Sequence, residues 1–121
     1  MGMKVEANSS KKILQVTLDG FVSTDAAAKV LGEYNQIVGE VNPREYSLLI
    51  DCTNMGVFQT DAIETLAKLY KLYMSTGFKH IVFIRAKSAI QNMQLDKAAK
   101  MVPGFTGVFV TNMDEALKSC M

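Results

Sequence analysis

The amino-acid sequence predicts an α/β fold with a mixed, mostly parallel central sheet of about five strands and helices packed on it. Strand-like apolar segments alternate with amphipathic helical patterns along most of the chain, which is typical of parallel sheets. Two short strand-like segments come first and predict an antiparallel hairpin at one edge of the sheet. The chain has 121 residues, of which 49% are hydrophobic, so residues 1–121 suit one domain with its own core.

The predicted hairpin has strands at residues 3–7 and 12–18, joined by a polar turn at residues 8–10. Apolar and polar side chains alternate from Leu14 onward, as they do in a strand with one buried face. We expect Asp19-Gly20 to end the second strand.

The segment STDAAAKVLGEYNQIVGEV predicts the clearest helix. Ser23 or Thr24 provides the N-cap, and Asp25 lies in the first turn, where the helix dipole favours negative charge. Asn42-Pro43 ends the helix. The apolar residues that recur at helical spacing, and that we expect to face the core, are Ala27, Val30, Leu31, Tyr34, Val38 and Val41.

A buried strand and a second helix flank the most informative turn of the sequence. YSLLIDC, residues 46–52, is a continuous apolar run of the kind that is buried on both faces of a sheet. A polar turn follows, and we expect Thr60 to cap a helix that Gly77 ends. The residues expected on the inner side of this helix are Ala62, Ile63, Leu66, Leu69, Tyr70 and Tyr73.

The remaining segments repeat the alternation of strand and helix. HIVFIRA, residues 80–86, predicts another buried strand, and Ser88 caps a helix that runs through Met101. Residues 107–110 form a short last strand, after which Thr111 caps a brief helix. The inner residues expected for the helix after Ser88 are Ile90, Leu95, Ala98, Ala99 and Val102.

Composition excludes several classes of function. The net charge is +1, without the clustered basic residues that nucleic acids favour. No glycine motif for phosphate binding occurs, so we predict no cofactor. Cys52 and Cys120 lack metal-ligand spacing and are expected to be reduced thiols in the cytoplasm. We find no signal peptide and no apolar run long enough for a membrane span, and Met1-Gly2 resembles a cloning remnant.

The candidates for catalysis and metal binding are few. His80 is the only histidine, and the sequence suggests no nucleophile and carboxylate that would complete a triad with it. Cys52 ends a central strand, where α/β sheets often bind ligands, but core packing is the favoured interpretation. Asp51 and Asp61 would make a weak hard-cation site. Alternatively, Asp51 accepts hydrogen bonds within the turn, which we favour, and Asp61 serves the helix N-terminus.

Four segments share the order and spacing of a known family. DGFVSTDAAAKVL combines a strand, a glycine, a short polar step and a helix, and LLIDCTNMGVFQTDAIETL combines a strand that ends in Asp, a loop and a helix. HIVFIRAKSAIQNMQ and FTGVFVTNMDEAL provide a later strand and helix and the final strand and helix. Together they resemble the STAS domain family, which includes sulfate-transporter cytoplasmic domains and anti-sigma-factor antagonists. The resemblance covers nearly the whole chain and implies a STAS-like architecture.

The resemblance is degenerate at the family's phosphorylation motif. The family's Asp-Ser-Ser-Gly aligns with Gln59, Thr60, Asp61 and Ala62. In antagonist members, a partner kinase phosphorylates a serine of this motif, and the phosphate blocks docking onto that partner. Asp61 occupies the phosphoacceptor position, or Thr60 does if the alignment shifts by one residue. Asp61 either imitates the phosphorylated state or is an ordinary helix-start carboxylate in a member that has lost the switch, and we favour the second interpretation.

The resemblance implies a non-catalytic regulatory module that docks onto a protein partner, such as an anti-sigma factor or a kinase-like ATPase, without the usual serine phosphoswitch. Docking would use the loop and helix start at residues 54–64. The residues implied as partner-binding or phosphoswitch-equivalent are Asn54, Gln59, Thr60, Asp61 and Glu64. An edge strand or a shared helix face would also allow a homodimer.

Two other hypotheses remain open. The alternative is a small-ligand-binding domain that holds an anion, nucleotide or lipid in a pocket at the carboxyl end of the sheet. Its candidate contacts are Thr53, Asn54, Thr60 and Arg85. An enzyme that relies on Cys52 or His80 is the least favoured hypothesis.

Overall fold

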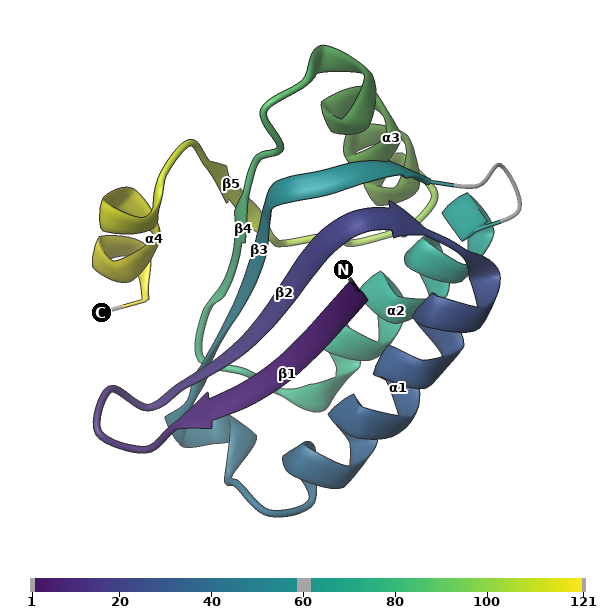
Figure 1. Ribbon diagram of the computed structural model, residues 1–121. Coiled ribbons are helices and arrows are strands. Elements are labelled where there is room, and N and C mark those ends of the chain that lie inside the picture. The colour runs from purple at the N-terminus through teal and green to yellow at the C-terminus, as the bar shows by residue number, and fades with distance from the viewer. Residues whose placement is uncertain (1, 59–61, 121) are drawn as a thin grey trace.

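The computed structural model describes residues 2–58 and 62–120, which form a five-stranded sheet with four α-helices (Figure 1). The strands are β1 (Gly2–Asn8), β2 (Ile13–Val22), β3 (Ser47–Phe58), β4 (Ile81–Ile84) and β5 (Val108–Val110), and their order in the sheet is their order in the chain. β1 pairs antiparallel with β2, and every later pair is parallel. The predicted mixed, mostly parallel sheet is therefore confirmed.

The helices cover the two faces of the sheet unequally. α1 (Thr24–Val38), α2 (Ala62–Thr76) and α3 (Ala89–Lys100) pack on one face, whereas α4 (Met113–Ser119) lies on the other (Figure 1). A short 3-10 helix (Pro43–Glu45) precedes β3. Side chains along β3 point alternately to the two faces of the sheet, so this strand contributes to both cores. Leu48 and Ile50 join the larger core, and Leu49 joins the core beneath α4. None of the helices in the described ranges combines the length and apolar character needed to cross a membrane.

The larger core is rich in aromatic rings. Tyr34, Tyr70 and Phe83 are fully buried, and both tyrosine hydroxyls have partners. The Tyr34 hydroxyl lies 2.9 Å from the Thr76 hydroxyl, and the Tyr70 hydroxyl donates to the Leu95 carbonyl at 3.4 Å. These contacts join α1 to α2 and α2 to α3, so the three helices form one layer over the sheet.

Two strands are longer than the sequence predicts. We expected Asp19-Gly20 to end the second strand and a polar turn to follow Cys52, but β2 continues to Val22 and β3 to Phe58. The two extensions pair with each other, Asp19 with Asn54 and Gly20 with Met55, across a shift in register. Gly20 adopts a φ of 80°, which a residue without Cβ reaches easily, so the irregularity bends the strand without ending it.

The helix starts agree with the predicted caps at two positions and differ at a third. Ser23 and Ser88 cap α1 and α3. Asn112, and not Thr111, caps α4: its Oδ1 accepts from the Glu115 amide at 2.9 Å. The Thr111 hydroxyl instead donates to the Glu115 carboxylate at 2.7 Å.

Two residues predicted to face the core are exposed. Leu31 is 37% exposed and Ile90 is 61% exposed, although the other inner residues predicted for the helix after Ser88 are buried or pack against the core. α1 also ends at Val38, before the predicted stop at Asn42-Pro43. The side chains of Ala27 and Ala62 lie outside the described part of the structure.

Candidate functional site

Three helices begin at the same end of the sheet. β2, β3 and β4 run parallel, and each leads from its carboxyl end into α1, α2 or α3 (Figure 1). In open α/β sheets, the carboxyl ends of the strands are the usual place for ligands and recognition loops. The segment predicted to dock a partner, residues 54–64, lies at this end, between β3 and α2.

The structure places two of the five predicted site residues. Asn54 is exposed on the extended part of β3, and Glu64 is exposed in the first turn of α2. Gln59, Thr60 and Asp61 lie outside the described residues, so their predicted roles, including the Thr60 cap, stay predictions.

Asp51 accepts hydrogen bonds from nearby residues, as we favoured, although it does so within β3 and not in a turn. Its Oδ1 accepts hydrogen bonds from the Thr53 amide at 3.0 Å and from the Thr53 hydroxyl at 2.6 Å. The carboxylate thus braces the backbone just beyond the buried part of β3. Within residues 2–58 and 62–120, no group of three or more His, Cys, Asp or Glu side chains is arranged to hold a metal ion.

The two candidate catalytic residues are far apart in the fold. His80 comes immediately before β4, and its carbonyl accepts from the Leu48 amide at the amino end of the sheet. Cys52 lies four residues further along β3 and is fully buried. Burial, together with the charge of Asp51, raises the pKa of the Cys52 thiol far above its ordinary value, so the neutral form prevails. This arrangement favours a core role for Cys52.

Two of the four contacts suggested for a small ligand at the carboxyl end, Thr53 and Arg85, are already engaged within the protein, whereas Asn54 is exposed. Thr53 is bonded to Asp51, and the Arg85 guanidinium pairs with Asp96 at 3.3 Å. The same guanidinium lies over the Phe109 ring, 4.6 Å from its centroid. Thr60 lies outside the described residues.

A groove between the first turn of α2 and the outer side of α3 is a recessed surface that begins at this end. It has a volume of about 620 Å³, and we call it the α2–α3 groove. Its lining residues are Ile63, Ile90, Met93, Gln94, Asp96, Lys97 and Lys100. Ile90 and Met93 are 61% and 70% exposed, which is unusual for side chains of this size.

Hydrogen bonds hold the beginning of α3 in place. The Asn92 side chain accepts from the Ala86 amide at 2.9 Å and donates to the Ala86 carbonyl at 3.0 Å. The Ser88 hydroxyl caps the helix by accepting from the Ile90 amide. The Arg85–Asp96 pair ties the end of β4 to the middle of the helix. The exposed side chains therefore project from a fixed helix.

Charge is distributed unevenly along the groove. Ile90, Met93, Lys97 and Lys100 follow one another at three- and four-residue spacing, so they form one outward stripe of α3. The stripe is apolar near the helix start and basic near the helix end. Asp96 is already paired with Arg85, which leaves the two lysines as a positively charged rim.

The sequence pattern did not predict the α2–α3 groove, because the helical spacing of Ile90 also fits a residue that faces the core. Leu95, Ala98 and Val102 are sufficient to define the buried side of α3. The sequence did contain one signal for an outward stripe, the three- and four-residue spacing that continues from Ile90 and Met93 to Lys97 and Lys100.

Comparisons with protein-family models and with curated proteins give no match for this sequence. Solved structures, in contrast, resemble it over almost the whole chain. An uncharacterized protein of the DUF3478 family with a SpoIIAA-like fold, from Shewanella loihica, superposes with a TM-score of 0.69 at 18% identity, covering 99% of this chain and 93% of that one.

Two anti-sigma factor antagonists are also similar. SpoIIAA in its unphosphorylated form gives a TM-score of 0.64 at 8% identity, covering 94% of this chain and 92% of its own. An anti-sigma factor antagonist from Mycobacterium paratuberculosis gives 0.62 at 17% identity, with 98% and 92% covered. These likenesses show that the chain has the SpoIIAA-like, or STAS-like, fold that the resemblance implied.

Proposed function

We propose that this chain is a non-catalytic regulatory module that binds a protein partner through residues 54–64 and the adjoining α2–α3 groove. The observation that carries the proposal is the pair of large apolar side chains, Ile90 and Met93, exposed on a helix start that hydrogen bonds hold in place. Anti-sigma factor antagonists share the fold, which supports a protein as the partner.

The groove has the composition of a recognition surface. Isolated apolar residues on a surface are common, but Ile90 and Met93 stand next to each other and beside Ile63, which is almost buried. Protein interfaces place such apolar side chains at the centre and charged residues at the rim. Lys97 and Lys100 supply that rim here, so the surface fits a partner segment with apolar and acidic side chains.

The partner class that the fold suggests is an anti-sigma factor or a kinase-like ATPase. The aligned phosphorylation motif contains no serine at residues 59–62, so we propose that docking proceeds without the usual serine phosphoswitch. Asp61 supplies a fixed negative charge in that segment, and Thr60 is the remaining hydroxyl there.

Affinity capture with matched variants tests the docking surface. Tagged wild-type chain, the double variant Ile90→Asp/Met93→Asp and the control Met101→Asp are incubated with a candidate anti-sigma factor or kinase-like ATPase. Met101 is 43% exposed at the end of the same helix but does not line the groove. We expect the double variant to lose the partner, because replacing a hot-spot residue near the centre of an interface typically costs about 2 kcal/mol or more. Binding that is equal in all three proteins refutes the docking surface.

Phosphorylation is tested separately. Wild-type chain and Thr60→Val are incubated with the candidate kinase and ATP, and the intact mass is measured. We expect no added phosphate on either protein. A phosphate on the wild-type chain that is absent from Thr60→Val would show that a phosphoswitch survives on threonine.

A further inference from the structure

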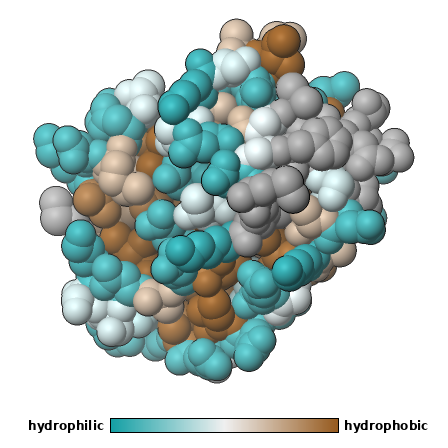
Figure 2. Space-filling model, in the orientation of Figure 1, coloured by the Kyte–Doolittle hydropathy of each residue, from teal (hydrophilic) through white to brown (hydrophobic). Residues whose placement is uncertain are grey.

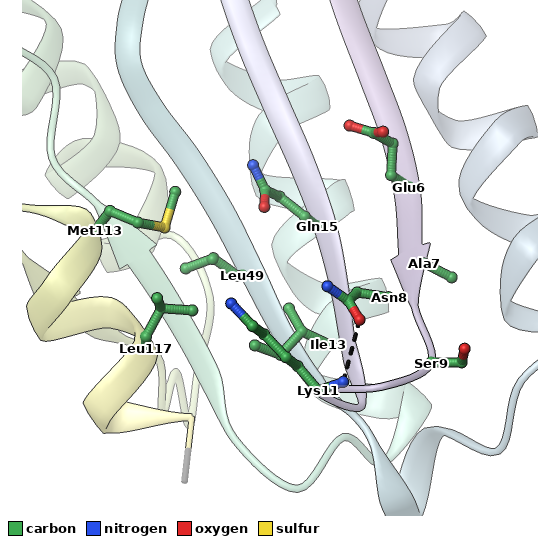
Figure 3. Close-up of a pocket in the computed structure, with 10 residues that line it drawn as sticks. All are labelled: Glu6, Ala7, Asn8, Ser9, Lys11, Ile13, Gln15, Leu49, Met113 and Leu117. Carbon is green, nitrogen blue, oxygen red and sulfur yellow. Dashed lines mark hydrogen bonds between the residues drawn. The ribbon is translucent and has the colours of Figure 1, made fainter.

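A second recessed surface lies on the opposite face of the sheet, between the β1–β2 hairpin and α4 (Figure 3). We call it the β2–α4 cleft, and its volume is about 470 Å³. Ile13, Leu49 and Leu117 form an apolar floor, and Met113 stands at its edge (Figure 3). In the space-filling view, hydrophobic surface is visible between α4 and the hairpin and is bordered by hydrophilic surface (Figure 2).

The cleft follows from the short length of α4. A helix of seven residues is about 10 Å long, so α4 covers only part of the sheet. It packs against Leu49, Val82 and Val110 on the central and later strands. The outward side chains of β2 become polar after Ile13, beginning with Gln15, and α4 does not extend over them.

Lys11 is the charged residue at the centre of this surface. Its side chain extends from the hairpin beside Ile13 towards Leu49 and α4 (Figure 3). A smaller adjoining hollow of about 330 Å³ shares Lys11, Ile13 and Leu117 with the cleft and reaches Cys120. Lys11 therefore stands between two recesses that share the apolar side chains of Ile13 and Leu117.

The positive charge of Lys11 has no carboxylate partner within residues 2–58 and 62–120. The ion pairs in these ranges are Lys4–Glu6, at 3.4 Å, and Arg85–Asp96. Glu6, the one carboxylate that lines the cleft, is thus already paired with Lys4. The Lys11 side chain is exposed, so its ammonium is hydrated in the free protein and available to pair with an anion whose tail lies on the apolar floor.

We propose that the β2–α4 cleft binds a small carboxylic acid with an apolar tail. The carboxylate pairs with the Lys11 ammonium, and the tail lies on Ile13, Leu49 and Leu117. A phosphate ester fits less well, because it brings close to two negative charges to a cleft whose lining contains one lysine. The Asn8 side chain lines the same wall and holds the turn by accepting from the Lys11 amide at 3.1 Å.

Octanoate is the probe for this site. Amide shifts of ¹⁵N-labelled protein are recorded as octanoate, acetate or 1-octanol is added. We expect saturable shifts at residues of the hairpin and α4 with octanoate, and much weaker effects with acetate, which lacks the tail, and 1-octanol, which lacks the charge. Shifts that centre on α3, equal binding of 1-octanol, or no saturable shifts with octanoate would each overturn the proposal.

Two variants and a control test whether the Lys11 ammonium binds the carboxylate of octanoate. Lys11→Gln keeps a side chain of similar shape without the charge, and Met113→Glu adds a carboxylate at the exposed edge of the cleft. Each should weaken octanoate binding roughly tenfold, which corresponds to about 1.4 kcal/mol. Lys118→Gln removes an exposed lysine of α4 that does not line the cleft and should leave binding within about twofold. Equal weakening in Lys11→Gln and Lys118→Gln would overturn the assignment to Lys11.

Discussion

Gly107 lies against the aromatic core, and replacing it with alanine should destabilise the protein. A Cβ at this position would lie 2.6 Å from Cε1 of Phe83 and 2.7 Å from Cζ of Phe105. Phe83 is fully buried and stacks with Phe109 at a centroid distance of 5.0 Å, so it has little room to move. Phe105 is only half-buried and can give way.

The cost of Gly107→Ala follows from the limited freedom of Phe83 and from the contacts that Phe105 loses when it moves. Inserting one methyl group into a packed core typically costs about 1–3 kcal/mol. Phe105 also contacts Tyr70 and Phe109, so its displacement weakens further ring contacts. We therefore expect a loss of about 2 kcal/mol in the free energy of unfolding.

Gly32→Ala is the matched control, with the opposite sign expected. Gly32 is exposed within α1, and a Cβ there would have no atom within 4 Å. Alanine in a helix interior is favoured over glycine by about 1 kcal/mol. Urea unfolding measures both variants: the midpoint should fall by about 1 M for Gly107→Ala and rise for Gly32→Ala. A Gly107→Ala midpoint equal to or above that of the wild type would refute the packing described for Phe83 and Phe105.

Three further predictions concern the buried polar groups. Ser47→Ala should lower the free energy of unfolding by about 1–2 kcal/mol, because the buried Ser47 hydroxyl donates to the Cys120 carbonyl at 3.0 Å. The control Ser75→Ala, on an exposed helix surface, should lower it by less than about 0.5 kcal/mol. Urea unfolding compares the two variants, and equal losses would contradict the role of Ser47. The Cys52 thiol should resist thiol reagents in the native protein and react only on unfolding, since burial raises its pKa; labelling as fast as that of a free thiol would show that the site is open. Burial raises the pKa of Tyr34 from 10 to about 12, with the Thr76 hydrogen bond opposing the shift, so the native state holds this proton more tightly than the unfolded state. The resulting stability is complete below pH 10 and is lost as the pH rises towards 12, and Tyr34→Phe should flatten the fall of the urea midpoint across that range.

Local sequence signals were sufficient to predict the type and order of the elements. Ser23 and Ser88 mark helix starts because their hydroxyls cap the helices through neighbours in the chain. The apolar run at residues 46–52 indicates a strand buried on both faces, and residues 48–50 are indeed packed on both sides. These features depend on short-range chemistry, so a single sequence contains them.

Features that depend on distant pairing could not be predicted in the same way. β2 and β3 continue past Gly20 and Cys52 because each extension supplies hydrogen-bonding partners to the other. Neither segment alone has a strong strand pattern. Asn112 replaced Thr111 as the cap of α4 for a related reason: both residues are good caps, and the choice depends on where the helix begins after β5.

The exposure of Ile90 shows why the candidate site was only partly predictable. An apolar residue at the start of a helix can face the core or the solvent, and the spacing of Ile90 allows both interpretations. In the fold, Leu95, Ala98 and Val102 fill the space over the sheet, and the bonds between Asn92 and Ala86 fix the rotation of the helix start. Ile90 and Met93 then face outward. Sequence reasoning placed the site at the start of α2, whereas the groove also requires α3.

The two recessed surfaces lie on opposite faces of one sheet and share no lining residue. Along β3, Leu49 lies under the β2–α4 cleft, whereas Ile50 and Cys52 pack beneath the helices that form the α2–α3 groove. A carboxylic acid in the cleft therefore makes no direct contact with a partner in the groove. Since substitutions at separate sites without shared partners are usually additive, Lys11→Gln should leave partner binding unchanged. Any influence of the ligand on the partner would have to cross the sheet, where β2, β3 and β4 all place side chains in both cores.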